Sequence, residues 1–131
     1  MKTLNNFING KSVPATSGKT SDLINPATGQ VFAKAPISSA TDVDSAMNAA
    51  AKAFEDFRDS TPSERQKALL KIADAIESRA DELVALESEN TGKPLAVTTS
   101  EEIPPMLDQI RFFAGAARNL EGRSAGEYMR G

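Results

Sequence analysis

Side chains that carry out enzyme chemistry are sparse in this sequence of 131 residues. It contains no Cys and no His. A thiolate nucleophile, a disulfide, an imidazole acid–base group and a thiolate-ligated metal are therefore excluded for this chain. Adjacent carboxylates at Glu101 and Glu102 suit an acid–base pair or a cation site, but negative charge near a helix start is the commoner role of such a pair. We identify no catalytic constellation.

The glycines do not predict a nucleotide site. Gly92-Lys93-Pro94 lacks the second Gly and the spacing of a phosphate-binding loop, and it predicts the end of a helix instead. Gly115 and Gly122 follow no predicted strand, so they do not form a dinucleotide fingerprint. Phe112 and Phe113 suit a ligand channel or a core: helical spacing favours the core for Phe113 and leaves Phe112 open between the two roles.

The longest helical signal covers residues 61–94. Thr61 and Glu64 predict a capping box at its start. Apolar residues at steps of three or four trace one face, namely Leu69, Ile72, Ile76, Ala80 and Leu83. Because Ser78 can cap a second helix, the segment is predicted as one helix or as two that bend near Arg79.

Two further helices are predicted, over residues 40–58 and 103–120, with a short helical turn and a loop between residues 96 and 102. Ser39 or Thr41 can cap the first of them. Prolines are tolerated only in the first turn of a helix, and Pro104 and Pro105 therefore locate the start of the last one. The predicted apolar stripes are Val43, Met47, Ala50, Phe54 and Phe57, and Met106, Ile110, Phe113, Ala117 and Leu120.

Strand signals occur only before the first helix. Asn9-Gly10 is typical of a type I′ hairpin turn, because both of its central positions need a positive φ. Residues 22–36 predict a second hairpin around a turn at residues 26–29.

Composition indicates one globular domain. Hydrophobic residues make up 40% and charged residues 25%, and the net charge is −3 with Lys and Arg scattered. Nucleic-acid binding is disfavoured without a basic face, and no apolar run is long enough to cross a membrane. The first residues lack the apolar core of a secretory signal, so we expect a cytoplasmic location.

Five segments, in order and spanning nearly the whole chain, resemble the N-terminal part of NAD(P)-dependent aldehyde dehydrogenases. They are FINGKSV (7–13), INPATGQVFAKAP (24–36), ATDVDSAMNAAAKAF (40–54), the segment TPSERQ to GKPL (61–95) and IRFFAGAARNLEG (110–122). Within the family, residues 101–131 are most similar to gamma-aminobutyraldehyde dehydrogenases. Betaine-aldehyde and succinic-semialdehyde dehydrogenases are the alternatives.

The resemblance implies an α+β, mostly helical fold without a complete Rossmann domain: β-hairpins at 5–36, three to four amphipathic helices at 40–120 and an extended exit segment at 121–131. Members of the family are several times longer, so it also implies an N-terminal fragment that is inactive and binds no cofactor by itself. The intact parent would bind NAD(P), form a thiohemiacetal on a Cys, transfer hydride and hydrolyse the thioester. It is expected to be a homo-oligomer.

The resemblance also places individual residues. By position, Pro105, Asp108 and Phe112 would lie nearest the aldehyde entry channel. Because Asp108 is an anion on a face that also carries an aromatic residue, we hypothesise that it helps to hold the distal ammonium of the substrate. The carbonyl of Ile24 and the region of Glu101 would lie near a structural monovalent cation.

A free-standing binding module is the competing interpretation. Its apolar face, around Phe112 and Tyr128, would dock a partner helix, whereas in the fragment interpretation the remainder of the parent chain covers such a face. No nucleic-acid or membrane partner is expected. Under the fragment interpretation, the isolated chain is expected to self-associate or to bind a hydrophobic dye.

Overall fold

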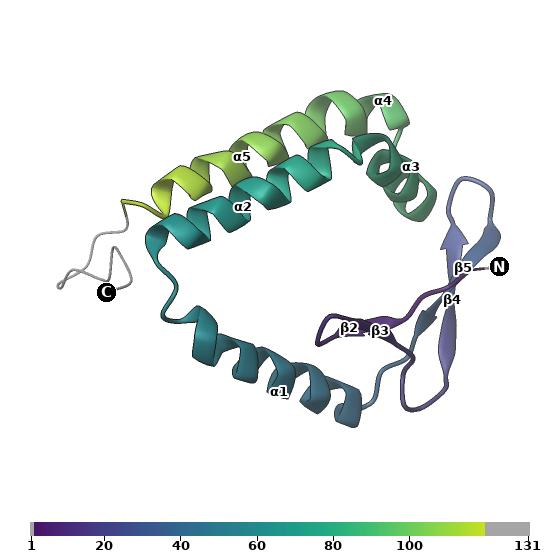
Figure 1. Cartoon of the computed structure of the whole chain (residues 1–131). Helices are drawn as coiled ribbons and strands as arrows, with labels where there is room; N and C mark the ends of the chain where they lie inside the picture. Colours follow the sequence, from purple (N-terminus) through teal and green to yellow (C-terminus); the bar gives the residue numbers. More distant parts are fainter. Residues whose placement is uncertain (1, 120–131) are drawn as a thin grey trace. The chain divides into compact units, whose positions relative to one another are not determined.

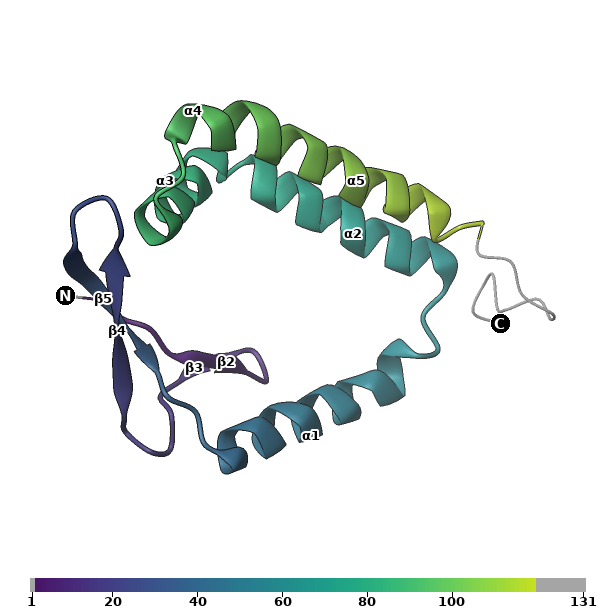
Figure 2. The ribbon, with the colours of Figure 1, turned by 180° about the vertical axis from the view of Figure 1, so that it is seen from behind.

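The computed structural model describes residues 2–119, which divide after Arg58 into two compact units. The first unit holds the strands and helix α1, and the second holds the remaining helices (Figures 1 and 2). The predicted exit segment at 121–131, which includes Gly122 and Tyr128, lies outside the described residues. Leu120 also lies outside them.

The first unit contains two small sheets. Strands β2 (Asn6–Ile8) and β3 (Lys11–Val13) form an antiparallel hairpin. Its turn has φ of 51° at Asn9 and 74° at Gly10, which confirms the predicted positive-φ turn.

The second sheet has the strand order β1-β5-β4. Strands β4 (Thr20–Asn25) and β5 (Gln30–Pro36) form the second predicted hairpin, with a register shift between Leu23 and Ile24. Strand β1 (Lys2–Thr3) pairs in parallel with β5. The predicted β region began at residue 5 and missed β1, because two residues carry no periodic signal.

Helix α1 (Ala40–Phe57) begins with a capping box between Ser39 and Asp42, which decides for Ser39 over Thr41 as the cap. Asp42 is only 5% exposed. Its carboxylate accepts hydrogen bonds from the backbone N–H groups of Ser39 at 2.7 Å and Thr16 at 3.0 Å. It also accepts hydrogen bonds from the side-chain hydroxyl groups of the same two residues. One side chain thus fastens the loop after β3 to the start of α1.

These hydrogen bonds predict a pH-dependent contribution to stability. The backbone N–H groups of Ser39 and Thr16 lower the pKa of Asp42 to about 2. A lowered pKa in the folded state stabilises the fold above the unfolded-state pKa near 3.8, and this stabilisation is lost as the pH falls through about 2. We therefore expect Asp42→Ala to lower the thermal midpoint at pH 7, and the difference from the parent chain to shrink between pH 4 and pH 2.

The matched control is Asp44→Ala on the exposed side of the same helix. It removes the same charge without the buried hydrogen bonds, so we expect little change in the midpoint. Equal losses in the two variants, or a difference that stays constant down to pH 2, would show that Asp42 does not act in this way. Calorimetry at several pH values measures both.

The predicted apolar stripe of α1 is exposed along its whole length in this chain. Its members are Val43, Met47, Ala50, Phe54 and Phe57. Within its own unit, α1 contacts strand β2, which covers little of this stripe. Side chains of this size normally lie in a core or at an interface.

Over residues 59–119, the second unit contains four α-helices and one π-helical turn. Their bounds are α2 (Pro62–Glu77), α3 (Ala80–Thr91), α4 (Leu95–Val97), the π-helix η1 (Thr98–Glu102) and α5 (Ile103–Ala116). The capping box of Thr61 and Glu64 is confirmed. The long segment predicted over residues 61–94 forms two helices, α2 and α3. Ser78 caps the C-terminal end of α2, and the N-cap residue of α3 is Arg79, not Ser78.

The loop predicted between residues 96 and 102 is wrong. The chain there continues as helix through η1, where the N–H of Ile103 donates to the carbonyl of Thr98, five residues back. Pro104 and Pro105 lie in the first turn of α5, as predicted. Because prolines have no N–H, the preceding turn receives no hydrogen bond from them, and the wider π-helical turn accommodates this loss. Helix α5 ends at Ala116, before the predicted residue 120.

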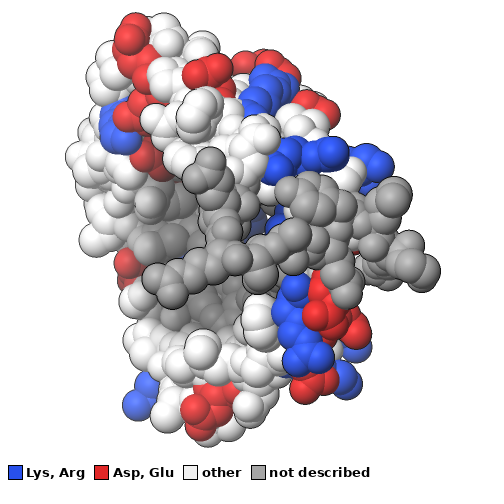
Figure 3. Space-filling view, turned by 90° about the vertical axis from the view of Figure 1, so that its left-hand side faces the viewer, with Lys and Arg blue, Asp and Glu red and all other residues white. Residues whose placement is uncertain are grey.

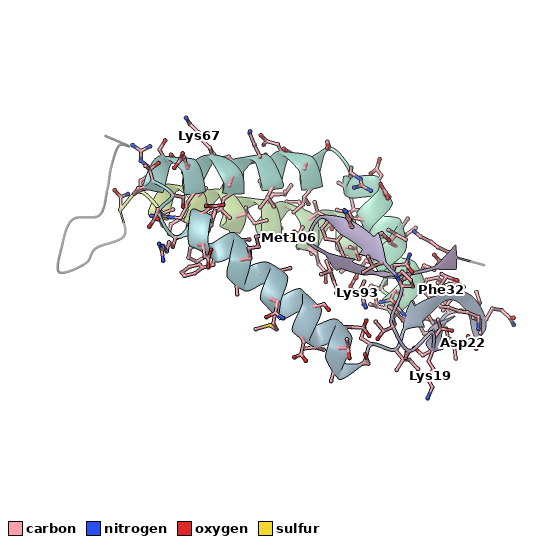
Figure 4. All side chains as sticks on the ribbon, turned by 60° about the horizontal axis from the view of Figure 1, so that its bottom comes forward. Lys19, Asp22, Phe32, Lys67, Lys93 and Met106 are labelled. Atoms are coloured by element: carbon pink, nitrogen blue, oxygen red, sulfur yellow. The ribbon has the colours of Figure 1, made fainter. Side chains whose placement is uncertain are left out.

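Helices α2 and α5 lie side by side and form the main packing contact of the second unit (Figures 1 and 2). Ala73 and Ala114 are both 0% exposed, and such small side chains allow two helices to approach closely. The prediction that Phe113 lies in the core is wrong, since Phe113 is exposed. Ile72 and Met106 of the predicted apolar stripes are also exposed (Met106 is labelled in Figure 4). The contact runs along a neighbouring face of each helix, on which the alanines lie.

Among residues 2–119, no helix combines the length and the apolar character needed to span a bilayer.

Candidate functional site

The outer face of α5 carries the three predicted channel residues. Pro105, Asp108 and Phe112 are spaced by three and four residues, which places them on one side of a helix, and all three are exposed. Phe112 is 68% exposed, and its ring meets that of Phe113, 60% exposed, edge to face at 5.3 Å. The structure thus brings the three residues together on one surface. Their place beside an aldehyde channel stays a prediction.

Next to this face, Arg111 joins α5 to α2. Its Nη2 atom lies 3.0 Å from Asp74 Oδ1 and 2.5 Å from Glu77 Oε2. The hydrogen bonds that Arg111 donates to Glu77 and Asp74 raise the pKa of Arg111 above its usual value. Sequence reasoning missed this cluster, because no local pattern relates Arg111 to partners 34 and 37 residues away.

A shallow pocket of about 310 Å³ opens between the two helices. Its lining consists of Glu77, Ile103, Pro104, Leu107, Asp108 and Arg111. The pocket therefore combines two carboxylates and one guanidinium with apolar side chains. Such a pocket can bind a small ligand by charge and apolar contact, but it offers no nucleophile.

Lys93, which is labelled in Figure 4, connects the turn after α3 to the π-helix. Its Nζ atom lies 2.7 Å from Glu102 Oε1 and 3.3 Å from Glu87 Oε1. Gly92, with φ of 79°, ends α3 in the left-handed conformation, as the Gly-Lys-Pro pattern predicts. One residue of the proposed carboxylate pair, Glu102, is thus used to hold this turn.

The two predicted cation ligands lie in different units. Ile24 is an exposed residue of β4 beside the register shift. Glu101 is an exposed residue of η1 whose carboxylate accepts a hydrogen bond from the Ser100 hydroxyl at 3.0 Å. No cluster of three or more acidic, His or Cys side chains within residues 2–119 suits a metal ion. A shared cation site stays a prediction.

Residues 2–119 also lack the glycine-rich turn with which a Rossmann fold binds the phosphates of a dinucleotide. Within the described range, β5 is the one strand that leads directly into a helix, through residues 37–39. This connection reads Ile-Ser-Ser and has no glycine, whereas a Rossmann phosphate turn needs glycines for close backbone approach. Residues 2–119 therefore supply no Rossmann-type phosphate cradle.

Charged side chains do not segregate by sign on the face shown in Figure 3, where blue and red atoms lie beside one another.

Comparison with known proteins decides the family. The model of the aldehyde dehydrogenase family matches residues 13–130. The chain belongs to the aldehyde dehydrogenase family. It is 41% identical over 113 residues to the 2-aminomuconic semialdehyde dehydrogenase of Danio rerio, covering 86% of this chain and 23% of that protein.

Solved aldehyde dehydrogenase structures share the fold. The NAD+ complex of the Bacillus cereus aldehyde dehydrogenase superposes with a TM-score of 0.88 at 35% identity, covering 95% of this chain and 26% of that one. The gamma-glutamyl-gamma-aminobutyraldehyde dehydrogenase of Burkholderia cenocepacia gives a TM-score of 0.86 at 33% identity, covering 93% and 25%. The chain thus has the mixed α+β, mostly helical fold of the N-terminal quarter of these enzymes. It spans about a quarter of the length of the relatives it matches.

Proposed function

We propose that this chain forms the N-terminal part of an NAD-dependent aldehyde dehydrogenase. There its exposed apolar helix faces would pack against the rest of the enzyme, and helix α5 would face the substrate. The observation that carries this proposal is the match of nearly the whole chain to one quarter of a dehydrogenase whose NAD+ complex is solved. In such an enzyme, NAD accepts the hydride and a Cys thiolate attacks the aldehyde. This chain contains no Cys, so its own residues would position and bind.

The exposed apolar faces support a covering role. Met47 and Phe54 on α1 and Phe112 and Phe113 on α5 are all more exposed than buried. Exposed apolar side chains in such number mark surfaces that contact another protein surface. We propose the remaining three quarters of the dehydrogenase as that surface, because the relatives with this fold contain it.

The substrate class follows from the charge of the α5 face. Asp108 is exposed, and it makes no ion pair with any other described residue. We propose that its carboxylate holds the ammonium of a cationic aldehyde such as 4-aminobutanal. The Burkholderia enzyme is named for an aldehyde with the same four-carbon aminoaldehyde chain, in which a gamma-glutamyl group acylates the nitrogen.

A graft tests this assignment. In the grafted dehydrogenase, residues 2–119 replace the aligned segment of the Bacillus cereus enzyme. We expect Asp108→Ala in the graft to raise KM for 4-aminobutanal on the order of fivefold, the scale of one exposed ion pair. KM for the neutral aldehyde butanal should stay unchanged, because butanal has no charge for Asp108 to bind.

The matched control is Gln109→Ala, which truncates the neighbouring exposed residue of α5 and should leave both KM values in place. Steady-state NADH formation at 340 nm measures all of them. An Asp108→Ala variant that keeps its KM for 4-aminobutanal would refute the substrate proposal.

A further inference from the structure

Asp108 and Arg111 are natural partners that do not pair. An acidic residue three positions before a basic one on a helix forms an ion pair readily. Here, however, the Arg111 guanidinium binds Asp74 and Glu77 on α2. Asp108 therefore keeps an uncompensated carboxylate one turn away.

We propose that Asp74 and Glu77 are positioning residues that hold Arg111 away from Asp108, and so keep Asp108 open to a cationic aldehyde. This inference rests on the proposed role of Asp108 in the dehydrogenase. It assigns a specificity-determining task to two side chains that need not touch the substrate.

The carboxylates of Asp74 and Glu77 compete with that of Asp108 for the single guanidinium of Arg111. Glu77, Asp108 and Arg111 line the same pocket, and Asp108 lies three residues before Arg111 on one helix, a spacing at which opposite charges can pair. Asp74 and Glu77 are spaced by three residues on α2 and present two carboxylates together to one Nη2 atom. Asp108 offers one carboxylate.

Burial favours the cross-helix arrangement only moderately. The Arg111 side chain is 37% exposed, and those of Asp74 and Glu77 are 71% and 56% exposed. Exposed ion pairs are individually weak, so a single remaining carboxylate on α2 should hold Arg111 less firmly than the two together. Removing both should release it to Asp108.

The kinetic test uses the grafted dehydrogenase and a mutant cycle. We expect Asp74→Asn with Glu77→Gln to raise KM for 4-aminobutanal about as much as Asp108→Ala does, on the order of fivefold. KM for butanal and kcat for both aldehydes should change little. Adding Asp108→Ala to the double variant should then have almost no further effect, because Asp108 is already occupied.

Arg111→Met is the decisive additional change. In the double variant it should restore a low KM for 4-aminobutanal, since no guanidinium remains to occupy Asp108. Arg111→Lys should restore KM only partly, because the ammonium keeps the charge but not the planar fork. If the cluster only joined the two helices, Arg111→Met would add to the damage and would raise KM for both aldehydes.

A second measurement does not depend on activity. In the 131-residue chain, nuclear Overhauser contacts between the Arg111 Hε and the Asp108 Hβ protons should be absent, and they should appear in the Asp74→Asn/Glu77→Gln variant. If Asp108→Ala alone leaves KM unchanged, the proposed function is wrong. If Asp108→Ala raises KM but the double variant does not, or the new contacts do not appear, the positioning inference is wrong.

Discussion

Replacing Ala73 with Leu is expected to lower the free energy of unfolding of the chain by about 2–3 kcal/mol. Ala73 is 0% exposed, in the face of α2 that packs against α5. Ala114 on α5 is equally buried, and Leu107 is nearly so. Three additional carbon atoms at this position must push the helices apart or force strained rotamers. Chemical denaturation measures the change.

Ala75→Leu is the matched control for this substitution. It makes the same change on the same helix, at an exposed position, and Leu retains a high helix propensity there. We expect its free energy of unfolding to stay within about 0.5 kcal/mol of the parent value. If the two variants were equally stable, the close α2–α5 contact would not exist in solution.

Placing charge on the α1 stripe is expected to weaken the self-association and the dye binding of the isolated chain. Met47 and Phe54 are 65% and 61% exposed and lie on one helix face. Met47→Lys with Phe54→Lys removes apolar surface that would otherwise bind a hydrophobic dye. We expect dye fluorescence to fall below that of the parent chain, with a shift toward monomer in sedimentation velocity, while Phe112 and Phe113 on α5 retain part of the dye binding. In the grafted dehydrogenase the same pair should prevent assembly, because the face would then have to bury two charges.

The control pair is Asn48→Lys with Ala51→Lys, at exposed positions beside the stripe. It adds the same charge to α1 and leaves the large apolar side chains in place. Dye binding by this pair should stay close to that of the parent chain. A parent chain that is monomeric and binds no dye would contradict the proposal that these faces are interfaces.

Local signals predicted most of the secondary structure, because the responsible contacts are local. The Asn9-Gly10 turn and the capping box at Thr61 depend on residues within four positions of one another. Strand β1 and the π-helix η1 were not predicted. Strand β1 exists only through its pairing with β5, which is distant in sequence, and η1 depends on how the chain accommodates two prolines without breaking its helix.

Which face of a helix is buried could not be read from hydrophobicity alone. The sequence pattern selected Ile72 and Phe113, yet α2 and α5 pack through Ala73 and Ala114. Large apolar residues also mark surfaces that a larger protein covers, and periodicity does not distinguish these from a core. The Arg111 cluster was missed for a related reason, since it forms only when α2 and α5 lie side by side.

Helical spacing explains one part of the predicted site and not the other. Pro105, Asp108 and Phe112 share an exposed face because their spacing is helical, and this much follows from the sequence. Ile24 and Glu101 lie in separate units of the chain, so their joint role in binding a cation stays a prediction.

The central claim is that this chain supplies covering surfaces and a substrate-facing helix to a dehydrogenase, and none of its reactive groups. The most direct test is NADH formation at 340 nm with NAD+ and an aldehyde, measured for the purified 131-residue chain beside the grafted dehydrogenase. We predict NADH from the graft and none from the chain alone. NADH formation by the chain alone, or an inactive graft that is nevertheless folded, would contradict the claim.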